Sequence, residues 1–188
     1  MAQSETRKDI LKLAQEHLLQ SGFNAFSFQT LADELGIRKA SIHYHFVSKE
    51  QMGVAVIENY VQSFLSWGLS VENYSPKRKL EMFLKIFERF ALDHCKICPT
   101  GVLSSDFNTL PRSMRLKLQE LHEVQRGWLM QILLDLKQRQ ELNSQIDLES
   151  WAELIMSAIQ GGLQIARIRQ DIESFRRVLR LLKNQLFG

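Results

Sequence analysis

Residues 27–50 most restrict how this chain can fold. Within them, apolar side chains recur at i, i+3, i+4 and i+7, the spacing of one buried face on a short helix: Phe28, Leu31, Ala32 and Leu35. Ser27 precedes that face and is a good N-cap residue, because its hydroxyl oxygen can accept from a free backbone N–H group. Gly36 follows the face, where a left-handed backbone closes a helix without a steric penalty.

A second short helix is predicted from about Lys39 to His45. Ile42 and Phe46 are spaced i, i+4, so both side chains are expected to point inward. Two short helices joined by a glycine turn form a helix-turn-helix, whose second helix can enter the major groove of DNA.

The outward side of this second helix is rich in groups that donate to phosphate oxygens and base edges. The candidate DNA-binding residues in the turn and the helix are Arg38, Lys39, Ser41, His43 and Tyr44. Ser27, Gln29 and Lys49, near the starts of the two flanking helices, are candidates for phosphate contacts. The bare pattern also fits a solvated polar face on a small helical bundle, and that alternative stays open.

Further positions in the same region agree in order and spacing with a known signature. They are Ile10-Leu11-x-x-Ala14, Gly22, Leu31-Ala32, Gly36-Ile37 and His45-Phe46-x-Ser48-Lys49-Glu50. Over about the first fifty residues, the chain resembles TetR-type (TetR/AcrR) transcriptional regulators. The resemblance implies a three-helix DNA-binding head, a helical ligand-binding body and a homodimer. The family usually has tyrosine where this chain has His43, so the phosphate contact of that position is unassigned and Tyr44 is the neighbouring candidate.

The composition favours an all-α fold. The chain has 188 residues with 45% hydrophobic content, three prolines, nine glycines and no alternating run of β-branched residues. We predict a helix-turn-helix DNA-binding domain at 1–47 and an effector-binding and dimerisation domain at 48–188. No apolar stretch approaches the roughly eighteen residues of a membrane span, and the N-terminus lacks the apolar core of a signal peptide. We therefore expect a cytoplasmic protein with no membrane partner.

Charge supports DNA binding only through its placement. The net charge is +3, yet residues 1–50 hold six lysines and arginines against six aspartates and glutamates. A phosphate-binding surface in this head therefore depends on the local positions of Arg38, Lys39 and Lys49.

Helical periodicity continues to the end of the sequence. The expected helices are 4–20, 49–69, one that begins near Pro76, 102–108, 113–140, 148–169 and 172–187, with a break at Cys98-Pro99-Thr100-Gly101. By resemblance, the last two helices pair with their copies in a four-helix dimer interface; closing the core of a monomer is the alternative. The interface candidates are Ala158, Gly162, Ala166, Phe175, Leu179 and Leu182.

A ligand pocket in the body would draw its walls from aromatic, histidine and methionine side chains. The candidates are Trp67, Phe87, His94, Phe107, His122, Trp128 and Met156. Core packing explains the same residues equally well.

Cys95 and Cys98 form a C-x-x-C pair, which can be structural, redox-sensing or metal-binding. A structural zinc site usually takes four ligands, and the sequence has no second pair. No nucleophile–base set, glycine-rich phosphate loop or metal quartet is visible. We therefore expect no enzyme activity, no catalytic residues, no cofactor and no bound metal.

Taken as a hypothesis, these features describe a ligand-responsive transcriptional regulator. It would be a repressor that binds a palindromic operator in double-stranded DNA as a homodimer, and an unknown small-molecule effector would release it. Two alternatives stay open: a thiol-switched regulator that uses Cys95 and Cys98, and a helical interaction module without DNA binding.

Overall fold

The computed structural model describes residues 2–94, 96–143 and 147–187, and its regular structure is helical throughout these parts. This confirms the predicted all-α class. The chain divides into two compact units, 1–63 with 99–121 and 64–98 with 122–188. Two helices, α4 (Lys49–Ser70) and α7 (Arg112–Gln138), contribute residues to both units.

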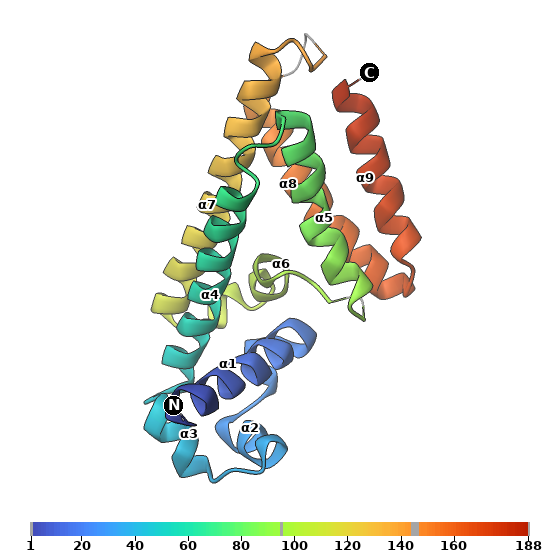
Figure 1. The fold of residues 1–188 in the computed structure, drawn as a ribbon. Helices are drawn as coiled ribbons and strands as arrows, with labels where there is room; N and C mark the ends of the chain where they lie inside the picture. The colour runs from blue at the N-terminus through green and yellow to red at the C-terminus, as the bar shows by residue number, and fades with distance from the viewer. Residues whose placement is uncertain (1, 95, 144–146, 188) are drawn as a thin grey trace. The chain divides into compact units, whose positions relative to one another are not determined.

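The first unit begins with α1 (Ala2–Ser21), α2 (Phe28–Leu35) and α3 (Lys39–His45), which lie against one another (Figure 1). A 3₁₀ turn, η1 (Phe23–Ala25), joins α1 to α2. The side chains at the centre of this group are almost completely buried: Ile10, Leu18, Leu31, Ile42 and Phe46. The inward positions predicted for Ile42 and Phe46 are confirmed.

Ser27 and Gly36 set the limits of α2. The Ser27 hydroxyl oxygen accepts from the backbone N–H of Thr30 at 3.2 Å, and the Thr30 hydroxyl accepts from the Ser27 N–H at 3.2 Å. This capping box satisfies two donors at the start of the helix. Gly36 has a φ of 65°, the left-handed conformation that the end of the helix requires. Both predictions of the helix limits are confirmed.

Compact packing in the first unit continues beyond the helix-turn-helix. The unit includes α6 (Pro99–Ser104), η2 (Phe107–Thr109) and the start of α7. A Cβ added to Gly53 of α4 would stand 2.6 Å from the sulfur of Met114 and 2.9 Å from the ring of Phe23. Three segments far apart in the sequence therefore meet at this glycine. The division into a DNA-binding domain at 1–47 and an effector-binding and dimerisation domain at 48–188 stays a prediction.

Pro99 begins α6 instead of breaking the chain, which corrects the expected turn at 98–101 and the expected helix at 102–108. Proline fits the first turn of a helix, because the N–H group that it lacks would have no helical partner there. The helix ends at Ser104, and the 3₁₀ turn η2 follows.

The second unit holds α5 (Pro76–Leu92), α8 (Leu148–Arg169) and α9 (Ile172–Phe187), with the end of α4 and most of α7. α8 and α9 run side by side (Figure 1) and have the predicted limits. An aromatic cluster, defined here as Phe64, Trp67, Phe83, Phe87 and Trp128, joins α4, α5 and α7.

Gly162 lets α9 approach α8 within one chain. A Cβ added there would lie 2.7 Å from the ring of Phe175. Most of the residues predicted for the dimer interface are buried inside this unit, namely Ala166, Phe175, Leu179 and Leu182, while Ala158 and Gly162 are half-buried. Four of the six residues therefore pack within this chain. The dimer contact through the last two helices stays a prediction.

We predict different effects of alanine at the two adjacent glycines of α8. Gly162→Ala places a Cβ against the Phe175 ring, so it should lower the free energy of unfolding by about 1–3 kcal/mol, the usual cost of overpacking. Gly161→Ala meets no atom within 4 Å and should be neutral or gain up to ~1 kcal/mol from helix propensity. Urea denaturation at one protein concentration measures both variants. Equal stability of the two would contradict the close contact at Gly162.

Candidate functional site

The exposed face of α3 and the turn before it form the first candidate site. Arg38 and Lys39 are exposed, and Tyr44 is 71% exposed. Ile42, on the opposite side of the helix, is completely buried. Burial of one side fixes the helix, so its polar residues stand together on the other side.

The two histidines of α3 contact aromatic neighbours. The ring of His43 meets that of Phe28 edge-on at a centroid distance of 4.9 Å, and the ring of His45 lies 5.2 Å from that of Tyr44. His43 is exposed, whereas Ser41 is half-buried. The contact with Phe28 holds His43 against α2, at the edge of the exposed face.

Ser27 and Gln29 are exposed, but their side chains already bond within α2. The Ser27 hydroxyl belongs to the capping box, and Nε2 of Gln29 donates to Oδ1 of Asp33 at 2.7 Å. A DNA phosphate at this helix end would compete with these bonds. The phosphate contacts of Ser27 and Gln29 stay predictions.

The ammonium group of Lys49 lies over two aromatic rings of the first unit. Its nitrogen is 4.5 Å from the ring centroids of both Phe23 and Phe26. Burial lowers the pKa of this lysine. Cation–π contacts stabilise a fold, so Lys49 has a structural role that the sequence did not indicate. Lys39 is the more exposed lysine beside α3.

Val47 is an apolar residue beside the same surface and is 81% exposed. Its backbone N–H donates to Oε1 of Gln51 at 2.9 Å, which fixes the loop between α3 and α4. An exposed apolar side chain at this place can contact a thymine methyl group. The sequence gives no sign of this role for Val47, because a single valine between two helices has no periodicity.

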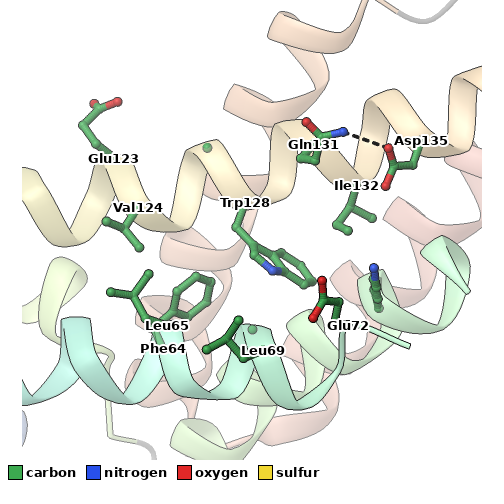
Figure 2. A pocket seen from close by; sticks show the side chains of 13 residues that line it. Phe64, Leu65, Leu69, Glu72, Glu123, Val124, Trp128, Gln131, Ile132 and Asp135 are labelled. Carbon is green, nitrogen blue, oxygen red and sulfur yellow. Dashed lines mark hydrogen bonds between the residues drawn. The ribbon is translucent and has the colours of Figure 1, made fainter. Parts of the chain in front are cut away.

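A pocket of about 730 Å³ in the second unit is the other candidate site. It opens between α4 and α7 (Figure 2), and we call it the α4–α7 groove. Its lining residues are Phe64, Leu65, Gly68, Leu69, Glu72, Lys79, Glu123, Val124, Gly127, Trp128, Gln131, Ile132 and Asp135. Its volume lies within the range of small-molecule sites.

The structure disperses the predicted pocket residues. Trp128 lines the groove, whereas Trp67 and Phe87 belong to the aromatic cluster without lining it. Met156 is buried in α8.

The other three predicted pocket residues lie outside the groove as well. His94 is exposed in the turn after α5 with a φ of 51°. Phe107 is half-buried in the first unit, and His122 is half-buried on α7.

The sequence analysis missed most of the groove, because its residues lie beside the main buried faces of α4 and α7. Leu65 and Leu69 are spaced i, i+4 and are both exposed. On α7, Val124, Trp128 and Asp135 are spaced i, i+4 and i+11, which also keeps them on one side. A second stripe next to the core stripe is the signal that would have indicated this site.

The thiol pair is only partly described. Cys98 is buried, and its thiol donates to Oε1 of Gln160 at 3.1 Å. Cys95 lies outside the described residues. Over the described ranges, no group of histidine, cysteine, aspartate and glutamate side chains is placed to hold a metal ion. None of the helices that the structure describes combines the length and hydrophobicity that a membrane span requires.

Two family models match the chain. Residues 10–56 match the model described as bacterial regulatory proteins, tetR family, and residues 76–182 match the tetracyclin repressor-like C-terminal domain. An uncharacterized HTH-type transcriptional regulator in the lacX 3′ region of Lactococcus lactis is 28% identical over 189 residues, or 95% of this chain and 91% of that protein. The HTH-type transcriptional repressor KstR2 of Mycolicibacterium smegmatis is 31% identical over 98 residues, or 48% of this chain and 46% of the repressor.

Solved structures of regulators superpose on the chain. A TetR transcriptional regulator from Legionella pneumophila is 31% identical, with a TM-score of 0.85 over 96% of this chain and 97% of that one. A TetR-family regulator from Agrobacterium tumefaciens is 24% identical, with a TM-score of 0.93 over 99% of this chain and 100% of that one. The second likeness concerns the fold alone. These relatives are described as transcriptional regulators, not as enzymes.

We predict that Lys39→Ala weakens DNA binding and leaves the stability of the fold unchanged, because this side chain is exposed. If Lys39 contacts a phosphate, the slope of log affinity against log salt should fall by about 1 for every DNA sequence. If it reads guanine, the loss should be roughly 1–3 kcal/mol at one base pair. Mobility shifts over a salt series distinguish these outcomes.

Lys49→Ala is the comparison variant, since it removes the same charge from a lysine that also lies over two aromatic rings. It should lower the free energy of unfolding by about 0.5–2 kcal/mol through loss of the cation–π contacts. Unchanged DNA affinity in both Lys39→Ala and Tyr44→Ala would show that α3 does not dock on DNA.

Proposed function

We propose a function from one premise: the chain belongs to the TetR family of bacterial regulatory proteins. It is therefore a transcriptional regulator with an N-terminal helix-turn-helix. The proposal is that it represses transcription by binding a palindromic operator as a homodimer. A small molecule in the α4–α7 groove would release it from that operator.

The observation that carries DNA binding is the two-sided character of α3. Its buried side is anchored by Ile42, while Lys39 and Tyr44 are exposed on the helix. A helix held in this way can enter a major groove as one rigid element. Among the described residues, neither Arg38 nor Lys39 has an ion-pair partner, so both cations are available to phosphates.

The groove supports a response to a ligand, because α4 contributes to both candidate sites. The helix begins at Lys49, four residues after the end of α3, and continues to Leu65 and Leu69 in the wall of the groove. A ligand that shifts the end of α4 would therefore act on the helix that follows the DNA-binding motif. We propose that α4 carries the signal.

The homodimer contact is proposed on a stripe of α8 that the core leaves uncovered. Leu154, Gly161, Ile165 and Ile168 are exposed and recur at i, i+7, i+11 and i+14, so they share one side of the helix. Leu181 of α9 is exposed as well. We call these five residues the α8–α9 stripe. The six residues predicted from the sequence lie on the same two helices, at buried and half-buried positions.

The thiol-switch alternative receives little support from the described residues. Cys98 is 1% exposed, so an oxidant has almost no access to its sulfur. The alternative of an interaction module without DNA binding differs from the proposal in one measurable property, sequence-selective binding to DNA.

Selection of genomic DNA fragments on the purified chain tests the proposed function. We expect an inverted repeat to be enriched, with an affinity that falls steeply as salt rises, because phosphate contacts release counterions. A following screen should find small molecules that release the enriched fragment. Binding that does not depend on sequence would reject the repressor and favour the interaction module.

Ile165→Glu should weaken dimerisation by about 2 kcal/mol, or roughly thirtyfold, because it places a charge in an apolar contact. Leu116→Glu is the control, since Leu116 is an exposed leucine of α7 in the first unit, outside the stripe. Sedimentation velocity over a concentration series measures both. A monomeric parent protein, or a dimer undiminished by Ile165→Glu, would show that the stripe is not the interface.

A further inference from the structure

We propose that the α4–α7 groove binds a lipophilic organic cation: a molecule with an apolar, preferably aromatic, body and one permanent or protonated positive charge. This inference rests on the proposed function only in naming the molecule an effector. The binding itself is argued from the shape, the aromatic surface and the charge of the groove.

The shape of the groove suits an apolar body. Leu65 and Leu69 are 45% and 73% exposed, an unusual exposure for leucines that line a pocket of about 730 Å³. Gly127 on α7 lines the groove, and a Cβ added there would meet no atom within 4 Å, so the lack of a side chain leaves space at this point. A ligand that covers the two leucines would remove apolar surface from water, which favours binding.

Trp128 gives the groove a fixed aromatic wall. Its ring stacks on that of Phe83 with a centroid distance of 5.5 Å and an interplanar angle of 19°. A Cβ added to Gly68 would stand 3.2 Å from Nε1 of Trp128, so this glycine lets the indole lie close to α4. Tryptophan is the best side-chain partner for a cation, and its position here is set before any ligand arrives.

Carboxylates surround this wall. Glu72, Glu123 and Asp135 line the groove, and among the described residues Lys79 is the one cation in its lining. Three carboxylates against one ammonium group leave a surplus of two negative charges. Figure 2 shows Glu72 and Asp135 in the walls of the groove, and Nε2 of Gln131 donates to Oδ1 of Asp135 at 2.8 Å.

Arg126, which precedes Gly127 of the groove lining on α7, pairs with carboxylates of α8 outside that lining. Nε of Arg126 donates to Glu153 of α8 at 2.9 Å, and its NH2 group pairs with Glu149. Over the described residues, Glu72 and Glu123 take part in no ion pair. The groove therefore attracts a positive charge and repels an anion of the same shape.

A matched pair of probes tests this inference directly. Tetraphenylphosphonium and tetraphenylborate have nearly the same size and aromatic surface but opposite charge. We expect calorimetric titration of the whole chain to show phosphonium binding at least about tenfold tighter than borate binding, with a preference that shrinks as salt rises. Equal or tighter binding of borate would overturn the proposal.

Substitutions locate the binding and test its cause. Glu72→Gln combined with Asp135→Asn should weaken phosphonium binding by about tenfold and strengthen borate binding, because two attractive charges are lost. Glu141→Gln is the control for charge, since Glu141 follows α7 outside the groove. It should leave both affinities unchanged. Loss of phosphonium affinity in Glu141→Gln equal to that in the double variant would also overturn the proposal.

Trp128→Phe provides a separate readout. It keeps an aromatic ring in the cluster but removes the indole, so phosphonium should no longer quench the fluorescence that this residue contributes. Unchanged quenching in this variant would place the ligand elsewhere and reject the site. Circular dichroism of the same samples checks that the helices are retained.

Failure of this inference can be told apart from failure of the proposed function, because these titrations use no DNA. A chain that selects an operator but does not prefer phosphonium refutes the ligand class alone. A chain that prefers phosphonium and selects no operator keeps the ligand site and refutes the repressor.

Discussion

A helix of seven residues is not stable in water by itself, because nucleation costs more than so few backbone hydrogen bonds return. α3 exists because Ile42 and Phe46 are buried, and the guanidinium group of Arg7 from α1 covers the Phe46 ring at 4.9 Å. Every outward residue of the proposed DNA-binding surface depends on that burial. The direction in which Lys39 points is thus decided by apolar side chains on the other side of the same helix.

The same constraint acts in the second unit, where packing both forms the core and leaves the groove. Phe83 is completely buried, and its ring stacks on the ring of Trp128. Trp128 in turn lines the groove. The glycines decide where elements approach closely. Gly162 admits Phe175, and Gly68 admits the Trp128 ring, whereas Gly127 has open space in front of it. A rigid core and an accessible apolar surface therefore come from one set of contacts.

The spacing of apolar residues and the capping residues predicted the limits of several helices and the face that each helix buries. The limits of α2, α8 and α9 follow from caps, turn residues and apolar spacing, all of which are local in the sequence. Periodicity does not show which neighbour a face will meet. Gly162 is predicted at a contact with a second copy, which stays a prediction; within its own chain it lies against Phe175, and the adjacent Gly161 has open space in front of it. A step of one residue turns a helix by about 100°, so adjacent residues face different neighbours. Spacing alone therefore does not show which of the two glycines would face a partner chain.

The placement of charge distinguishes the two candidate sites more clearly than its total. The head is neutral in sum, yet Arg38 and Lys39 are exposed. The rest of the chain has more cations than anions, yet the lining of the α4–α7 groove holds more carboxylates than ammonium groups. Surfaces of opposite charge attract ligands of opposite charge, so a cation that binds the groove is repelled by the basic surface proposed for DNA phosphates. Such a ligand cannot displace DNA by occupying the same surface. In the proposed function, an effect of such a ligand on DNA would pass through an element common to both candidate sites. α4 begins four residues after α3 and contributes Leu65 and Leu69 to the wall of the groove.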